Sequence, residues 1–194
     1  MGIPREPRNK NQGLRRDYTQ APYITKAYLL GMLHDGTKRK TTYRIAQKGM
    51  AFAKMLSLGI KRLSGRAWIY QEGKLRDVYI TEFSQSLLLE TTIKTDQDKL
   101  DYVRGYFDAE GGIAKSSKVR FYIYFAQKNF DDLNQIKTIL EEFSIHTGII
   151  HNPSRNIDPK YWRFFVKADS YKSFITTIGS SHPDKKKYFR LYQG

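Results

Sequence analysis

With 194 residues, 40% of them hydrophobic, the chain is long enough to bury a core as one compact unit or as two small ones. Its 34 Lys and Arg residues exceed its 19 Asp and Glu residues, and the net charge of +15 favours polyanionic partners, nucleic acid first. The apolar runs are too short for a membrane span, and the sequence has no signal-peptide core. It also has no cysteine, which rules out disulfides and thiolate metal sites. We therefore expect an intracellular, reducing compartment (cytoplasm, nucleoid or organelle matrix).

The chain begins with a basic leader, which we expect to form an N-terminal arm over residues 1–21. Five of its side chains are positively charged: Arg5, Arg8, Lys10, Arg15 and Arg16. Such a segment can lie along phosphates or serve only as a solubilising tail, and the sequence favours neither interpretation.

After the leader, the chain contains a faint internal repeat. Residues 27–36 resemble 101–111, residues 44–48 resemble 124–128, and residues 84–93 resemble 170–179. The three matches keep the same order, while their separation grows from 74 to 80 to 86 positions. We therefore predict a shortened first repeat over residues 22–93, a polar linker at 94–97, and a second repeat over residues 98–194 that ends in a basic tail.

Periodicity predicts the elements that open each repeat. Residues 25–33 and 101–107 are apolar on most sides, which indicates helices buried against a partner. Residues 118–125 alternate between apolar and polar side chains and predict a half-buried antiparallel strand. Its inward face would carry Val119, Phe121, Ile123 and Phe125.

The remainder of the second repeat indicates a helix, a strand pair and another helix. Asn129 is a suitable N-cap, and apolar residues then recur at helical spacing: Leu133, Ile136, Leu140 and Phe143. Residues 149–151 and 162–167 flank a turn-rich segment and predict two paired strands, and residues 170–178 predict a closing helix. Each repeat is thus predicted to run helix, two strands, helix, two strands, helix.

Both opening helices end in an acid followed by glycine, Asp35-Gly36 and Glu110-Gly111. A carboxylate is disfavoured at a helix C-terminus, which carries partial negative charge, and two such ends side by side would repel. A hard divalent cation such as Mg²⁺ would relieve both penalties, because it binds carboxylate and free backbone carbonyl oxygens. Glycines at matching positions, Gly31 and Gly105, would let the two helices pack closely.

The second of these segments resembles a known family motif. Val103 to Gly111 (VRGYFDAEG) is similar to the LAGLIDADG motif of homing endonucleases, and Tyr28 to Gly36 resembles the same motif with one residue missing after Gly31. The Gln-Lys pairs at 47–48 and 127–128 fall where that family places active-site residues, and residues 181–186 resemble its basic tail. The resemblance, to the monomeric two-repeat type, covers most of residues 24–190.

This resemblance implies an α/β (α+β) fold of two pseudo-symmetric αββαββα repeats, with antiparallel sheets forming a DNA-binding saddle. It implies an intron-encoded, monomeric, Mg²⁺-dependent hydrolase in which Asp35 and Glu110 hold the metal. Gln47 and Gln127 would orient water, and Lys48 and Lys128 would stabilise developing charge. The expected partner is double-stranded DNA, and the expected contacts are Lys38, Arg39, Lys40, Thr42, Arg44, Lys118, Arg120, Tyr122 and Arg163.

The first repeat departs from the motif in three ways. Asp35 follows Gly31 by four residues, whereas Glu110 follows Gly105 by five, and one residue turns a helical side chain by about 100°. His34 stands where the second repeat has Asp108, and the segment 37–41 is too short for a long first hairpin. Cleavage of both strands, nicking of one strand, and loss of cleavage in a DNA-binding protein therefore all stay open. So do an intron RNA maturase and a ribosome- or RNA-associated protein.

Overall fold

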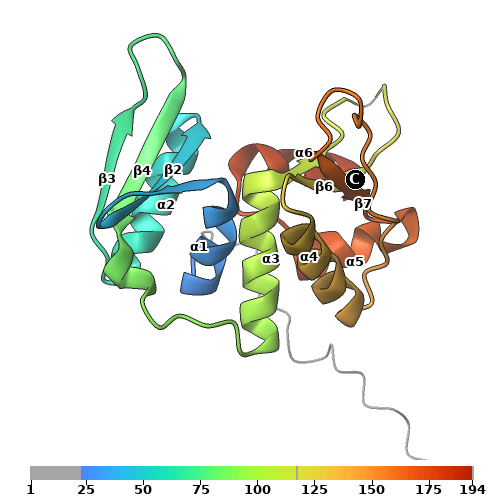
Figure 1. The fold of residues 1–194 in the computed structure, drawn as a ribbon, viewed down its shortest axis with the longest axis horizontal. Helices are drawn as coiled ribbons and strands as arrows, with labels where there is room; N and C mark the ends of the chain where they lie inside the picture. The colour runs from blue at the N-terminus through green and yellow to red at the C-terminus, as the bar shows by residue number, and fades with distance from the viewer. Residues whose placement is uncertain (1–22, 117, 194) are drawn as a thin grey trace, which may run out of the picture.

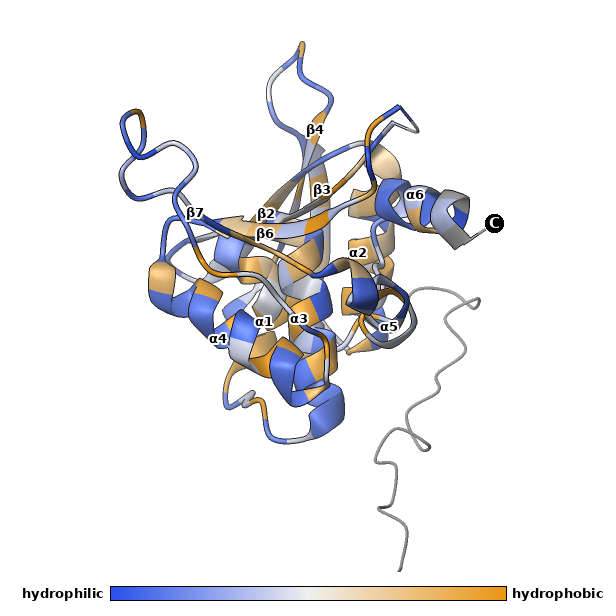
Figure 2. Cartoon of the chain, turned by 90° about the vertical axis from the view of Figure 1, so that its right-hand side faces the viewer, coloured by the Kyte–Doolittle hydropathy of each residue, from blue (hydrophilic) through white to orange (hydrophobic). Residues whose placement is uncertain are grey.

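The computed structural model describes residues 23–116 and 118–193, so the expected N-terminal arm lies outside the described residues. Two helices, α1 (Lys26–Met32) and α3 (Asp96–Glu110), stand side by side in the middle of the molecule. A sheet and its helices flank them on each side (Figure 1). Seen from the side, the strands form one layer and most of the helices lie beneath it (Figure 2).

The first repeat surrounds α1 with a four-stranded sheet. Its further elements are η2 (Leu33–Asp35), β1 (Gly36–Lys38), β2 (Thr42–Lys48), α2 (Met50–Arg62), β3 (Ala67–Gln71), β4 (Val78–Ser84) and η3 (Gln85–Leu88). The strand order is β1-β2-β4-β3 and all pairs are antiparallel. The predicted closing helix of this repeat is only η3, a four-residue 3-10 turn.

The second repeat follows with a three-stranded antiparallel sheet in the order β5-β6-β7. Its elements after α3 are β5 (Gly111–Ile113), β6 (Ile123–Gln127), α4 (Phe130–Glu142), β7 (Trp162–Phe165), η4 (Ala168–Ser170), α5 (Tyr171–Thr177) and α6 (Pro183–Gln193). The mixed α/β class with antiparallel sheets, predicted from the sequence, is confirmed. Asn129 caps α4 as predicted, with its side chain accepting bonds from the backbone N–H groups of Asp131 and Asp132.

Two predicted strands of the second repeat are shorter than expected. The strand predicted at 118–125 is β6, which begins only at Ile123, and Val119 is 49% exposed. Its partner β5 is three residues long and pairs Ile113 with Ile123, so the chain before Tyr122 has no neighbouring strand to bond. The segment 149–151 pairs with β7 only through an isolated bridge between His151 and Arg163.

The expected linker at 94–97 is partly helical. Its polar residues form the N-terminal cap of α3, because the Thr95 hydroxyl accepts a bond from the backbone N–H of Asp98 and the Asp98 carboxylate accepts one from that of Thr95. This reciprocal capping box lets the helix begin at Asp96, directly after the connection.

The core consists of two apolar clusters, one beneath each sheet. Phe52 and Phe83 belong to the first cluster, and Phe107 and Phe164 belong to the second. Leu30 on α1 packs against both clusters and so links them across the helix pair. Among the described residues, no helix has the length and apolar character that a bilayer span requires.

The helix pair is tight because glycine occupies both contact points. A Cβ atom at Gly31 would lie 2.1 Å from the carbonyl oxygen of Tyr102, and one at Gly105 would lie 2.0 Å from that of Tyr28. Both obstructing atoms are backbone, so neither can rotate away. The two helix backbones therefore touch, and only residues without a Cβ fit between them.

Replacing one interface glycine tests this contact. We expect Gly105→Ala to lower the free energy of unfolding by roughly 3 kcal/mol or more, because the helices must separate and their apolar contacts loosen. Gly148→Ala is the control, since its nearest neighbour would be 3.6 Å away, and we expect a change within about 0.5 kcal/mol. Urea unfolding of the two variants measures both values, and equal stabilities would contradict the close packing.

Candidate active site at the paired helix ends

Asp35 lies at the end of the first helix, where the helix changes its winding. The residues 33–35 form the 3-10 turn η2 rather than a continuation of α1. One α step and three 3-10 steps from Gly31 advance about 7.5 Å, as do the five α steps from Gly105 to Glu110. The 3-10 steps also recover roughly 60° of the roughly 100° lost with the missing residue. The tighter turn thus compensates for the shorter motif.

Glu110 is the last residue of α3, and its carboxylate is held by a neighbouring strand. The Gln127 side-chain amide on β6 donates a hydrogen bond of 2.7 Å to Glu110 Oε1. Burial, and next the negative charge of Asp35, raise the pKa of Glu110 to about 7. The structure therefore brings the two acids, from different repeats, into electrostatic contact.

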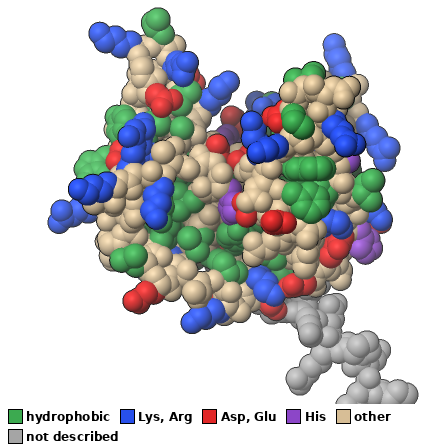
Figure 3. Space-filling view, viewed as in Figure 1, with side chains coloured by type: hydrophobic (Ala, Val, Ile, Leu, Met, Phe, Trp, Pro, Cys, Tyr) green, Lys and Arg blue, Asp and Glu red, His purple; other side chains and the backbone are tan. Residues whose placement is uncertain are grey.

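A cavity of about 360 Å³ opens beside Asp35. Gln47 and Lys48, at the end of β2, line it together with Lys115 and Lys185 from the second repeat. In the space-filling view the molecule is hollowed between two upper lobes, and Lys and Arg side chains project from both lobes (Figure 3). Three of the sequence-predicted residues of the first repeat thus share one cavity.

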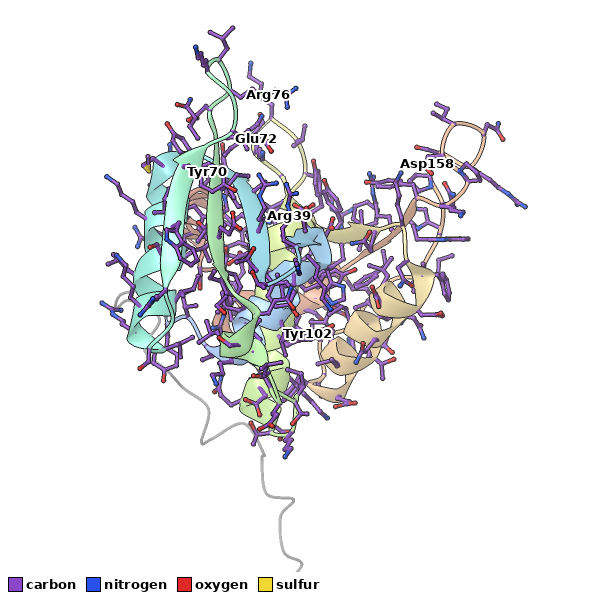
Figure 4. The ribbon with its side chains drawn as sticks, turned by 60° about the vertical axis from the view of Figure 1, so that its left-hand side comes forward. Arg39, Tyr70, Glu72, Arg76, Tyr102 and Asp158 are labelled. Carbon is purple, nitrogen blue, oxygen red and sulfur yellow. The ribbon has the colours of Figure 1, made fainter. Side chains whose placement is uncertain are left out.

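Lys128 is placed differently from Lys48. Its ammonium lies 3.3 Å from the carboxylate of Asp158, and its side chain is 71% exposed. Asp158 belongs to the loop that rises over the second sheet, away from the helix ends (Figure 4). The two Gln-Lys pairs are therefore not equivalent: Lys48 lines the cavity beside Asp35, whereas Lys128 is paired with Asp158.

The residues present fit a divalent cation of the Mg²⁺ type. Burial and then the charge of Asp35 disfavour the ionised form of Glu110, and a cation held by both carboxylates would offset both effects. Within the part of the chain that the structure describes, no three His, Cys, Asp or Glu side chains gather around one point. Two carboxylates suffice for a hard divalent cation whose remaining positions are filled by water and substrate phosphates.

Lys185 on α6 is a residue of this site that the sequence did not predict. Its ammonium donates hydrogen bonds to the backbone carbonyls of Phe107, Asp108 and Gly111 at the end of α3. Burial lowers the pKa of Lys185 to about 8, and its charge lowers the pKa of both Asp35 and Glu110. The sequence shows it only as part of a basic tail, and nothing in the spacing places that tail beneath the acids.

His34 and Asp108, at corresponding positions of the two motifs, form crossed contacts between the repeats. The Tyr28 hydroxyl donates a 2.6 Å bond to Asp108 Oδ2, and the Tyr102 hydroxyl lies 2.6 Å from His34 Nε2. The other imidazole nitrogen lies 3.1 Å from the carboxylate of Asp132. His34 thus takes the place of Asp108 as the partner of a tyrosine on the opposite helix.

On the first sheet, the expected DNA contact Arg44 is surrounded by polar partners. Its guanidinium lies within 4 Å of the carboxylates of Glu72 and Glu82 and 5.7 Å from the ring centre of Tyr70. Glu82 also accepts 2.6 Å bonds from the hydroxyls of Thr42 and Tyr70. Figure 4 shows Arg39, Tyr70, Glu72 and Arg76 together over this sheet. The charge of Arg44 is therefore largely compensated.

On the second sheet, Arg163 has a different environment. Its guanidinium lies 4.7 Å from the ring centre of Tyr124 and donates a 3.0 Å bond to the Tyr161 hydroxyl. No carboxylate among the described residues forms an ion pair with it. Arg163 is thus a guanidinium held on an aromatic surface with its charge uncompensated.

Of the other expected DNA contacts, Lys38 and Thr42 lie in β1 and β2, and the rest lie in connections. Lys38 ends β1, and Arg39 and Lys40 form the exposed turn before β2. Lys118 and Arg120 are exposed in the segment before β6, and Tyr122 packs near Tyr124 with ring centres 5.9 Å apart. These side chains come from both repeats and do not form one continuous strand surface.

Comparison with known proteins agrees with this architecture. A family model described as the LAGLIDADG-like domain matches residues 97–179, from the first turn of α3 to just beyond the end of α5. Residues 97–179 are a LAGLIDADG-like domain. The resemblance that the sequence suggested is confirmed, and Glu110 stands at the end of the LAGLIDADG helix α3.

Solved structures extend the LAGLIDADG fold to most of the chain. I-DmoI in complex with DNA and Mn is 22% identical, with a TM-score of 0.58 over 81% of this chain and 97% of that one. The N-terminal LAGLIDADG domain of DUF199/WhiA is 18% identical, with a TM-score of 0.63 over 81% and 86% of the two chains. Full-length DUF199/WhiA from Thermatoga maritima is 17% identical, with a TM-score of 0.64, and 63% of it is covered by 89% of this chain. No curated protein sequence matches the chain.

The raised pKa of Glu110 on the LAGLIDADG helix has a measurable consequence for stability in metal-free protein. The folded state binds a proton at Glu110 up to about pH 7, whereas the unfolded chain releases it near pH 4.5. Stability is therefore lost as the pH rises through this window. We compare the free energy of unfolding of Glu110→Gln with that of the unmodified chain. We expect this difference to shift in favour of the variant by roughly 1–2 kcal/mol from pH 5 to pH 8, allowing for solvent screening of this partly exposed group.

Urea unfolding with a chelator present measures this difference. Exposed Glu90→Gln is the control, and its effect should not change over the same pH range. A constant offset for Glu110→Gln between pH 5 and pH 8 would contradict the raised pKa of Glu110.

Proposed function

We propose that the chain is a site-specific, metal-dependent DNA endonuclease of the homing endonuclease type, acting as a monomer on a long double-stranded target. One observation carries the proposal: Asp35 and Glu110, from different repeats, meet electrostatically at the ends of two touching helices, beside a cavity open between two basic lobes. Structural stability alone gives no reason for two acids at adjoining helix C-termini, where both the helix dipoles and the acids repel.

DNA as the partner is supported by charge and by structural neighbours. The chain carries a net charge of +15, which favours binding to phosphates. I-DmoI, with the same fold, has been crystallised with DNA and Mn and with DNA and Ca, and a variant of it with its target DNA in the presence of Mg. A major groove is wide enough to receive a two-stranded ribbon such as the β3–β4 hairpin that projects from the first repeat.

The proposed chemistry is hydrolysis of phosphodiester bonds. Asp35 and Glu110 would hold the cation, taken to be Mg²⁺, which when bound supplies a Lewis acid for the phosphate and lowers the pKa of a bound water. Gln127 fixes the orientation of the Glu110 carboxylate through its 2.7 Å bond. Gln47 and Lys48 line the cavity beside Asp35, where an amide can orient water and an ammonium can stabilise negative charge on phosphate oxygens. Lys128 can take the same role only after leaving Asp158.

A second function, DNA binding with one strand cut or none, is favoured by the inequality of the two Gln-Lys pairs. Lys48 lines the cavity, but Lys128 is paired with Asp158. The LAGLIDADG fold also occurs in DUF199/WhiA, whose name states no nuclease activity. Encoding within an intron, and RNA binding as a maturase, stay predictions from the sequence.

Cleavage can be tested on DNA sites that the protein itself selects. Sites bound in Ca²⁺ are selected from a random duplex library and then incubated with the protein in Mg²⁺. We expect both strands to be cut by the unmodified chain, and Asp35→Asn and Glu110→Gln to cut at least ~100-fold more slowly while binding stays within about threefold. If cleavage persists in a chelator, the reaction does not require a metal. If the unmodified chain and both variants all leave the DNA intact, the nuclease proposal is wrong and the chain is a DNA-binding protein.

The DNA-binding surface is tested by removing one guanidinium. We expect Arg163→Gln to weaken binding to a selected site about 10-fold or more, because its uncompensated charge and fixed plane suit a phosphate or a guanine edge. Lys172→Gln, on α5 in the helix layer, removes an equal charge from an exposed position and should change the affinity less than about twofold. Titrations at two salt concentrations measure both, and equal losses would show that only net charge matters.

A further inference from the structure

The last two turns of α3 are enclosed by residues 178–185, a segment that we call the clasp. At its start, Arg104 Nε donates a 2.7 Å bond to the carbonyl of Ile178. In its middle, the carboxylate of Asp108 accepts bonds of 2.8 Å and 3.1 Å from the backbone N–H groups of Ser181 and His182. The clasp thus attaches to α3 at several points before α6 begins.

Lys185 closes the clasp at the end of α3. Its ammonium donates to the carbonyl oxygen of Phe107, to that of Asp108 at 3.0 Å and to that of Gly111 at 2.7 Å. It also lies 4.7 Å from the ring centre of Phe107. Two of these carbonyls belong to the last turn of α3 and the third to its C-cap residue Gly111, so one side chain donates to three acceptors around Glu110. All three hydrogens of the ammonium are used on backbone.

The first repeat has no counterpart of this lysine in the part of the chain that the structure describes. No side chain there donates a hydrogen bond to a carbonyl of Leu33, His34 or Asp35. In the first repeat the closing turn η3 is followed directly by the connection to α3. No segment equivalent to the clasp therefore follows η3. Among the described residues, a side chain thus donates to the backbone carbonyls at the end that carries Glu110, and none does so at the end that carries Asp35.

We propose that Lys185 is a positioning residue of the cation site, which locks the end of α3 so that the Glu110 carboxylate stays beside Asp35. The inference rests on the proposed function, because it assigns the cation to these two acids. Lys185 donates its hydrogen bonds to backbone carbonyls and acts through the backbone of residues 107–111. Positioning also explains why a positive charge is kept next to a cation site that it would otherwise weaken.

This role is distinguishable from a simple charge effect, since the two predict opposite results. If the ammonium acted only as a nearby charge, its removal would strengthen cation binding, because one repulsion is lost. If it positions Glu110, its removal weakens binding, as loss of an outer support commonly does by ~10–100-fold. A purely structural role would change overall stability and leave the affinity of the folded protein unaltered.

The test uses the full chain with Mn²⁺ alone as the probe. Lys185→Met is compared with Lys187→Met, an exposed neighbour on the same helix. We expect Lys185→Met to bind Mn²⁺ at least ~10-fold more weakly and Lys187→Met to be unchanged. Amide hydrogen exchange should speed up at residues 107–111 in Lys185→Met, while residues 100–104 keep their protection, which shows that the rest of α3 stays folded.

Unchanged or stronger Mn²⁺ binding by Lys185→Met, or unchanged exchange at 107–111, overturns the proposal. Failure of the proposed function gives another pattern. In that case Asp35→Asn and Glu110→Gln bind Mn²⁺ as the unmodified chain does, or none of the proteins binds it. A global loss of protection in Lys185→Met would mean that the lysine holds the whole fold, which also overturns a positioning role.

Discussion

The contact on which the molecule depends is that of two helix backbones at Gly31 and Gly105. Because no Cβ separates them, α1 and α3 run side by side to their ends, and the acids that follow are delivered to one place. The crossed hydroxyl contacts of Tyr28 with Asp108 and of Tyr102 with His34 then hold the two helices in register. Each sheet follows its own helix, so the helix contact also sets the hollow between the lobes.

Features with a local cause were predictable from the sequence. The repeated glycine and acid, and the alternation that ends in Phe125, depend on residues near each other in the chain. The strand predicted at Val119 was not formed, because alternation cannot show that β5 stops at Ile113 and leaves that stretch without a partner. The 3-10 turn that compensates for the missing residue before Asp35 was likewise not predicted, because the length of a motif does not determine whether a helix end winds as an α or a 3-10 helix.

Long-range features were missed for a related reason. The sequence assigned the free carbonyls at the end of α3 to a metal, but an ammonium from α6 bonds the carbonyls of Phe107 and Asp108 there and that of Gly111 just beyond. Residues 183–193 resemble a solvated basic tail, but aromatic side chains dock this helix on the core: Phe189 stacks on Phe107 with ring centres 5.9 Å apart, and Tyr192 stacks on Phe121 at 4.0 Å. Charge patterns in the sequence indicate which polar groups require a partner, whereas tertiary packing determines which partner binds them.

The unlike halves have one more consequence. A four-stranded sheet with its projecting β3–β4 hairpin faces a three-stranded sheet with the loop 152–160, so a half-turn about the helix pair does not reproduce the molecule. A ligand whose two ends are related by a two-fold rotation could not fit both halves equally well. For the proposed activity this gives a polarity: the duplex has a defined forward direction on the protein, and each end of its recognised stretch can change in evolution without obliging the other to follow.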